Sequence, residues 1–300
     1  MTDKTLNIKN ENVEKKDKIL KLVDLDIQRT FDESDKNKLF SQTKTQPIQL
    51  TFNNVNIKTD KEEFLVKDVS GTVKLGKLIV LLGPSGCGKT TLMNTITGLL
   101  DENLAGDGQI YLNKELINSD HQSNLIAYCE HKIMGCEDLT VKTQVEYSAS
   151  LYNKNSDEVA NNIIDGLYLT REKEKEYQVC SGGQQVRISI ATNLTTKASI
   201  YILDEPLTGL DSYSERKVID AIKELSDLDK TVLLSVHQPS ESFFDQFDEF
   251  ILMTNGSIVF QGTKEETIKY FALIGFVKEQ KFVSSRLLFK DYYIRKRFLK

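Results

Sequence analysis

Short blocks of consecutive apolar residues recur along this 300-residue chain, and they are typical of buried strands. The clearest block is Leu78 to Leu82, as expected for a parallel strand that is covered on both faces. Similar blocks lie at residues 124–130, 200–203 and 231–235. We therefore expect strands of one mainly parallel sheet at these positions.

Between these blocks the apolar spacing changes to that of helices. The first such stretch follows the block at 78–82, and its apolar positions are Leu92, Ile96, Leu99 and Leu100. Helical periodicity also marks residues 139–177, 184–196 and 213–227. Intervals of three and four residues place these side chains on one face of a helix, so we expect helices in all four stretches.

Antiparallel strands are predicted on either side of this alternating region. Residues 48–57 form a strand-like pattern, 71–77 read as a further strand and turn, and 108–118 as a hairpin. A last pair is expected at 249–260, around an Asn-Gly turn. The strands and helices that alternate after residue 78 predict an α/β fold with a mainly parallel sheet and helices on both faces.

The two ends of the chain differ in composition from its middle. Residues 1–46 are polar and contain only Phe31 and Phe40 as aromatic residues, so we expect them to be largely disordered. Residues 277–300 mix basic and apolar side chains. Two interpretations of this tail stay open: an amphipathic segment that lies on anionic lipid or a membrane subunit, or a tail that packs on the domain or frays.

Composition also excludes several classes of protein. With 39 basic and 44 acidic residues the net charge is −5, so no overall positive field recruits nucleic acid. The spacing of the cysteines matches neither a zinc site nor a secreted disulfide framework, which indicates a reducing compartment. No window reaches the ~18 consecutive apolar residues of a membrane span, and the N-terminus lacks a secretory signal, so we expect a cytosolic chain.

The clearest chemical motif is the loop that follows the strand at 78–82. Gly83, four further residues, and then Gly88, Lys89 and Thr90 fit the Walker A spacing, in which backbone N–H groups surround phosphates. Lys89 is expected to contact the β- and γ-phosphates and Thr90 a Mg²⁺ ion, while the next helix points its positive end at the anion. The predicted nucleotide-binding residues are Gly83, Pro84, Ser85, Gly86, Cys87, Gly88, Lys89, Thr90 and Thr91. A glycine-rich turn without a ligand is the alternative interpretation.

Two adjacent carboxylates follow the strand at 200–203. Asp204 is expected to hold Mg²⁺ together with Thr90, and Glu205 to act as the general base that activates water. An apolar run followed by Asp-Glu is common at strand ends, where it often has no chemical role. The preceding Walker A loop is what makes this pair a predicted Walker B motif.

A serine-glycine run precedes the helix at 184–196. Ser181, Gly182, Gly183 and Gln184, after Cys180, resemble the LSGGQ signature of ATP-binding cassette (ABC) proteins, with Cys in the place of Leu. Backbone amides at a helix N-terminus form a second anion site, although a plain helix cap is the alternative interpretation. In that family the signature of one domain closes over the ATP held by another, so the resemblance implies a head-to-tail dimer. It also places Ser181 to Gln184 among the nucleotide-binding residues.

Two further motifs follow in the order found in ABC proteins. Asp211, within residues 206–212, resembles the D-loop residue that couples the two sites of a dimer and is also assigned to nucleotide binding. His237, within residues 235–240, resembles the switch histidine that holds the γ-phosphate, Glu205 and the water in line. The resemblance implies the ABC-ATPase fold of P-loop NTPases, with catalytic Glu205 and His237 and with ATP and Mg²⁺ as cofactors.

Segments 139–151, 237–240 and 256–276 resemble the nucleotide-binding domain of the G subfamily of ABC transporters. Such proteins place this domain before six membrane helices, work as dimers, and commonly move lipids, sterols or amphipathic compounds. The resemblance implies a domain at 47–276 with an N-terminal antiparallel β subdomain and a helical subdomain at about 137–183.

This resemblance also implies partners and a location. The partners would be a second ABC nucleotide-binding domain and a transmembrane domain, which lies on another chain or is missing from this one. The location would be the cytosolic face of a membrane, or otherwise the cytoplasm. A soluble ABC-type ATPase with a regulatory or interaction role, and a truncated half-transporter, remain as alternatives.

Two positions depart from the family's pattern. The glutamine that contacts Mg²⁺ and reports ATP to the membrane domain falls on His131, with Glu130 as an adjacent substitute. The aromatic residue that stacks on adenine falls on Ile57, so base binding is expected to use apolar contact there, or Phe52 or Phe64 instead.

Overall fold

The computed structural model describes residues 48–117, 125–130, 135–196, 198–227, 229–237 and 241–274. The expectations for residues 1–46, for His131 and for residues 277–300 lie outside these ranges. All described residues belong to one compact unit, Gln46–Lys300.

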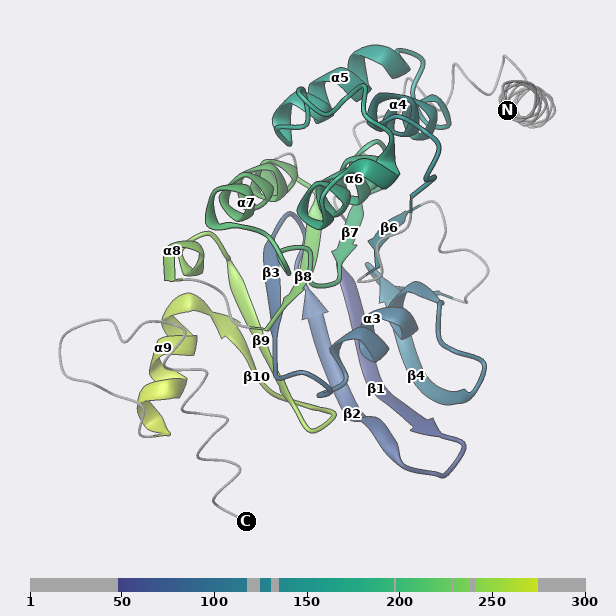
Figure 1. The fold of residues 1–300 in the computed structure, drawn as a ribbon. Coiled ribbons are helices and arrows are strands. Elements are labelled where there is room, and N and C mark those ends of the chain that lie inside the picture. The colour runs from purple at the N-terminus through teal and green to yellow at the C-terminus, as the bar shows by residue number, and fades with distance from the viewer. Residues whose placement is uncertain are drawn as a thin grey trace. The chain divides into compact units, whose positions relative to one another are not determined.

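A six-stranded sheet with the order β10-β9-β3-β8-β7-β6 forms the centre of this unit (Figure 1). Its strands are β3 (Leu78–Leu82), β6 (Ile126–Cys129), β7 (Ile200–Leu203), β8 (Thr231–Val236), β9 (Glu249–Thr254) and β10 (Ser257–Thr263). The strands β9, β3, β8, β7 and β6 run parallel to one another, and β10 is antiparallel to β9. The apolar blocks of the sequence therefore became the parallel strands, as predicted.

A second, antiparallel sheet has the order β2-β1-β4-β5. Its strands are β1 (Leu50–Thr59), β2 (Phe64–Val73), β4 (Leu104–Leu112) and β5 (Glu115–Leu116). The prediction of a strand at 71–77 was wrong in its bounds, because β2 begins at Phe64 and pairs with β1 from Lys58 back to Leu50. The predicted hairpin at 108–118 is β4 and β5, but β4 begins earlier because it also pairs with the whole of β1.

The helices are α3 (Lys89–Thr97), α4 (Val141–Ser150), α5 (Ser156–Gly166), α6 (Gly182–Leu194), α7 (Ser212–Asp227), α8 (Glu241–Phe244) and α9 (Lys264–Leu273), with a 3₁₀ turn η2 (Tyr177–Val179). Five of the helices, α3 to α7, lie in stretches where the sequence predicted them, whereas α8 and α9 were not predicted. The first helix is shorter than predicted, since it ends at Gly98 in the left-handed conformation and leaves Leu99 52% exposed. None of the helices among the described residues is both long and apolar enough to cross a bilayer.

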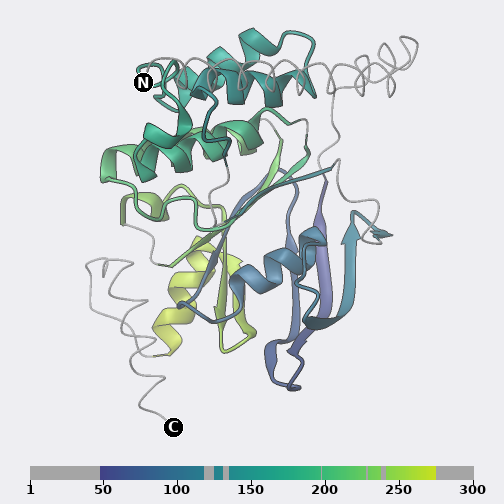
Figure 2. The same cartoon turned by 45° about the vertical axis from the view of Figure 1, so that its right-hand side comes forward.

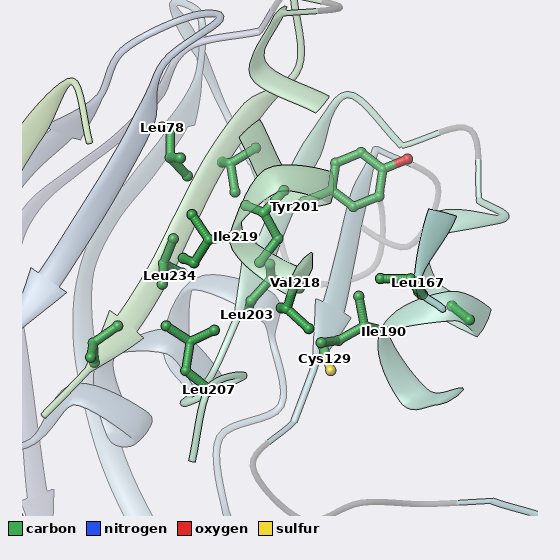
Figure 3. Packing of buried hydrophobic residues seen from close by; sticks show 14 of the residues in the cluster. Leu78, Cys129, Leu167, Ile190, Tyr201, Leu203, Leu207, Val218, Ile219 and Leu234 are labelled. Carbon is green, nitrogen blue, oxygen red and sulfur yellow. The ribbon is translucent and has the colours of Figure 1, made fainter. Parts of the chain in front are cut away.

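Side chains of the parallel strands point alternately into two hydrophobic clusters. In β3, Leu78, Val80 and Leu82 belong to one cluster, while Ile79 and Leu81 belong to the other. The first cluster includes residues of α4, α5, α6 and α7, such as Ile219 of α7, which Figure 3 shows beside Leu234 of β8. The second includes residues of α3, β1 and β2, and the turned view shows α3 beside the antiparallel strands (Figure 2). The parallel sheet is thus covered on both faces.

Candidate nucleotide-binding site

Three predicted motifs meet at one edge of the parallel sheet. The loop 83–88 follows β3, Asp204 and Glu205 follow β7, and His237 follows β8. These strands are neighbours and parallel, so their carboxyl ends lie side by side. A cavity of about 360 Å³ opens there, and it is lined by Leu65, Ser85, Gly86, Gly88, Lys89, Thr90, Thr91, Glu205 and His237.

The phosphate-binding loop depends on glycine where it turns into α3. Gly88 has φ 101°, and a Cβ atom there would lie 2.7 Å from the carbonyl oxygen of Leu65. The tip of the β9–β10 hairpin supports the same loop, because the N–H of Gly256 donates to the carbonyl oxygen of Cys87 at 3.0 Å. Burial raises the pKa of the Cys87 thiol, with Lys89 acting in the opposite direction, so this thiol is held in its neutral form.

Lys89 is the buried cation of the site, with only 4% of its surface exposed. Its Nζ donates to the carbonyl oxygens of Gly83 at 2.9 Å and Pro84 at 3.2 Å. The same atom lies 3.7 Å from Oε1 of Glu205 and 3.4 Å from Nδ1 of His237. A buried ammonium group needs such partners, and here they hold the Lys89 ammonium beside the cavity at the phosphate loop.

Asp204 and Thr90 are directly linked. The hydroxyl of Thr90 donates to Oδ2 of Asp204 at 2.7 Å, and Asp204 is 1% exposed. The carboxylate and hydroxyl oxygens are hard ligands of the kind that Mg²⁺ prefers, so the two residues fit this ion. In the described ranges no group of three or more His, Cys, Asp or Glu side chains is arranged around a metal position.

Glu205 and His237 form a second linked pair. Nε2 of His237 lies 2.7 Å from Oε1 of Glu205. A neutral imidazole protonated on Nε2 donates to this carboxylate and accepts from the Lys89 ammonium through Nδ1, which satisfies both contacts. This arrangement orients a carboxylate towards the cavity, where it can accept a proton from water.

Ser235 is a polar residue of the site to which the sequence analysis assigned no role. Its hydroxyl donates to Asp204 and accepts the backbone N–H of Glu205 at 2.9 Å. The signal in the sequence was a hydroxyl directly after the apolar residues 232–234, in the strand that follows the Walker B strand.

The signature residues lie elsewhere. Ser181 caps α6 in a capping box, where its side chain accepts from the N–H of Gln184 at 3.3 Å and the Gln184 side chain accepts from the N–H of Ser181 at 2.9 Å. None of Ser181 to Gln184 lines the cavity at the phosphate loop. The structure thus brings together the Walker motifs and His237, but not the signature.

Asp211 has a local role in this structure. Its carboxylate accepts the N–H groups of Tyr213 and Ser214, each at 3.0 Å, and the hydroxyl of Ser214 at 2.8 Å, at the start of α7. The hydrogen bonds from Ser214 hold the pKa of the Asp211 carboxyl below its ordinary value. The coupling role that the resemblance implies for Asp211 stays a prediction.

Of the three residues expected to contact the adenine base, two are buried in the structure and one is exposed. Ile57 and Phe52 are buried in the cluster below β1, so the expectation that either one contacts a base was wrong. Phe64 is 46% exposed, with the ammonium groups of Lys58 and Lys67 at 4.8 and 5.4 Å from its ring centre. The substitute Glu130 is exposed, and nothing in the described residues joins it to the site.

Comparison with known proteins places this site in a family. The family model described as ABC transporter matches residues 66–208. ABC transporter G family member 7 of Arabidopsis thaliana is 31% identical over 77% of this chain and 34% of its own length. ATP-binding cassette sub-family G member 5 of Mus musculus is 30% identical over 74% and 36%, and the protein white of Drosophila melanogaster 30% over 70% and 33%. The chain therefore spans about a third of the length of these relatives.

Solved structures agree on the fold. An ATP-binding subunit of an ABC transporter has a TM-score of 0.66 and 22% identity, covering 81% of this chain and 99% of the other. A bacterial ABC transporter cassette, solved as a dimer, has a TM-score of 0.63 and 24% identity, covering 72% and 98%. The predicted ABC-ATPase fold, with its parallel sheet and antiparallel β part, is thereby confirmed. The chain contains a nucleotide-binding domain of the ABC transporter family, similar to those of the G subfamily.

Proposed function

We propose that this chain binds MgATP between two copies of its domain, hydrolyses it, and drives transport of lipid or amphipathic substrates through a membrane domain. The observation that carries the hydrolytic part is the meeting of Lys89, the Thr90–Asp204 pair and the Glu205–His237 pair at one cavity. Phosphoryl transfer to water needs a cation for the phosphates, an oxygen site for Mg²⁺ and a positioned base, and these residues supply all three.

Each side chain has a separate task in this proposal. The loop N–H groups and Lys89 hold the β- and γ-phosphates, while His237 donates its Nε2–H to Glu205 and keeps this carboxylate aligned. Glu205 orients the attacking water and accepts its proton. When bound beside Asp204 and Thr90, Mg²⁺ neutralises charge on the phosphate oxygens.

The second copy supplies what this domain lacks at its cavity. Ser181, Gly182 and Gly183 lie at the start of α6, away from the phosphate loop, where they present a helix N-terminus. We propose that they close over the ATP of the partner, with Asp211 near the same interface. The related bacterial cassette that was solved as a dimer supports this arrangement.

The transport step rests on the relatives. They are named as G-family ABC transporters, and this chain matches about a third of their length. We propose that the membrane domain comes from further polypeptide and that the nucleotide-binding domain works at the cytosolic face of the membrane. Lipid or amphipathic cargo follows from the subfamily resemblance. Co-purification with a membrane-embedded partner supports transport, while a stable soluble assembly contradicts it.

The substitution Glu205→Gln tests the hydrolytic part. It keeps the size of the side chain but removes the base, so ATP hydrolysis is expected to fall by about 10²–10⁴-fold while ATP binding is retained. With ATP the variant should elute as a dimer in size-exclusion chromatography. Glu102→Gln, an exposed position before β4, is the matched control and should hydrolyse ATP like the wild type. Hydrolysis by Glu205→Gln at the wild-type rate would show that another group is the base.

A further inference from the structure

One buried hydroxyl connects the two Walker B carboxylate residues. Leu203 of β7 pairs with Leu234 of β8 in parallel register, so the next residues, Asp204 and Ser235, lie beside each other. Ser235 is fully buried, at 0% exposure. Its hydroxyl donates to Oδ1 of Asp204 and accepts the backbone N–H of Glu205. The Ser235 hydroxyl thus acts as donor to Asp204 and as acceptor from Glu205, two adjacent residues that follow β7.

The hydrogen bond from the Glu205 N–H to Ser235 matters because the backbone of Glu205 is in a strained conformation. Glu205 has φ 52°, in the left-handed region that residues other than glycine rarely adopt. This conformation turns the chain sharply after β7 and directs the Glu205 side chain to His237 and Lys89. The hydroxyl of Ser235 binds the N–H group of this strained residue and therefore helps to hold the turn.

The same hydroxyl orients the Asp204 carboxylate. Oδ1 of Asp204 faces Ser235, and Oδ2 accepts the hydroxyl of Thr90. With one oxygen held from β8 and the other from α3, the carboxylate is restrained from rotating. Asp204 therefore presents a defined geometry to an ion at Thr90.

We propose that Ser235 is a positioning residue that sets the placement of the Glu205 base relative to the metal-binding Asp204 carboxylate. This inference rests on the proposed ATP hydrolysis. Without the hydroxyl, the buried Asp204 oxygen and the Glu205 N–H lose a partner, and the turn at Glu205 relaxes. Ser235 does not line the cavity at the phosphate loop, so ATP held without metal is expected to keep its affinity.

The full chain carrying Ser235→Ala tests the inference with three measurements. The kcat for MgATP is expected to fall by about tenfold or more, as for other misplaced catalytic groups, with KM changed much less. The affinity for Mn²⁺ in the presence of ATP, measured by electron paramagnetic resonance, is expected to fall several-fold, about the size of a lost outer-shell contact. The affinity for ATP in EDTA is expected to stay unchanged. Ser235→Thr, which keeps the hydroxyl, is expected to retain more of kcat and of Mn²⁺ affinity than Ser235→Ala.

Thr231→Val is the matched control on the same strand. Thr231 is also fully buried, and its hydroxyl donates to the carbonyl oxygen of Ile48 at 2.6 Å at the opposite end of β8. This variant is expected to unfold at a lower temperature while keeping kcat and Mn²⁺ affinity. If Ser235→Ala does not fold, Ser235→Cys, with a similar volume and a weak donor, takes its place with the same expected losses.

The outcomes separate the two proposals. Wild-type kcat and Mn²⁺ affinity in Ser235→Ala, or equal losses of both in Thr231→Val, overturn the positioning role. Absence of ATP hydrolysis in the wild-type chain overturns the proposed function. In that case the Mn²⁺ affinities of Ser235→Ala and Thr231→Val still decide whether Ser235 orients Asp204.

Discussion

The phosphate loop and the signature segment differ in how many contacts they make with other elements of this chain. Residues of the phosphate loop and of the first turn of α3 contact three other elements: Lys89 reaches Glu205 and His237, Thr90 bonds to Asp204, and Cys87 accepts from Gly256. The signature residues 181–184 bond mainly among themselves and to Glu172. The first region is thus joined to several other elements, whereas Ser181 and Gly182, at the start of the second, are exposed among the described residues.

Mixing two variants gives the largest expected effect. Lys89→Ala removes the phosphate cation, and Gly182→Glu places a carboxylate at the signature, where a Cβ atom meets nothing within 4 Å. Gly182→Glu should therefore fold normally, because an acidic residue in the first turn of a helix is favourable, but it should repel a phosphate. Each variant alone is expected to show almost no ATP hydrolysis.

A one-to-one mixture of these variants is expected to recover about a quarter of the wild-type rate. About half of randomly formed dimers are mixed, and each mixed dimer has one intact site out of two. The rate of phosphate release measures this recovery. A mixture as inactive as its components would show that the phosphate loop and the signature segment do not meet across a dimer. The difference between the two regions would then have no role in hydrolysis.

Gly256→Ala is expected to have an intermediate effect. It disturbs the hairpin tip that hydrogen-bonds to Cys87 of the phosphate loop and leaves the signature segment untouched. Gly256 has φ 75°, and a Cβ atom there would lie 2.7 Å from the carbonyl oxygen of Leu65. The strain should lower the free energy of unfolding by about 1–3 kcal/mol and weaken ATP binding. Chemical denaturation and ATP titration measure both. Gly182→Ala, in open space at the signature, is the control and should change stability by no more than about 0.5 kcal/mol.

The smallest effect is expected at Glu215, which lines a cavity of about 200 Å³ next to Glu205. Burial raises the pKa of the Glu215 carboxyl. A raised folded-state pKa means that the contribution of Glu215 to stability is complete below its unfolded pKa and is lost as pH rises through the folded one. Glu215→Gln should therefore melt at most about 2–4 °C above the wild type at pH 8.

This difference should disappear near about pH 4, where glutamate is largely protonated in either state. Thermal unfolding at the two pH values measures it, and the exposed Glu102→Gln should show no such trend. A Glu215→Gln variant that is less stable than the wild type at pH 8 would mean that the carboxylate has a stabilising partner.

The sequence predicted the parallel strands, the helices α3 to α7 and the phosphate loop because these depend on local patterns, but it missed α8, α9 and the start of β2. Five apolar residues at 78–82 are enough to indicate a strand buried on both faces. The sequence did not show that Ile57 and Phe52 both point into the core, because strict alternation places residues five apart on opposite faces, and only the bulge around Asn54 brings both to the covered face. It also missed Ser235, whose role depends on the register between β7 and β8.

The bond between Gly256 and Cys87 joins residues that are far apart along the chain. During synthesis, the segment that carries Cys87 leaves the ribosome long before the β9–β10 hairpin exists. The phosphate loop can reach its supported shape only after that hairpin has been translated and has joined the sheet. A nascent chain should therefore acquire full ATP affinity late, which protects a half-built cassette from engaging nucleotide early.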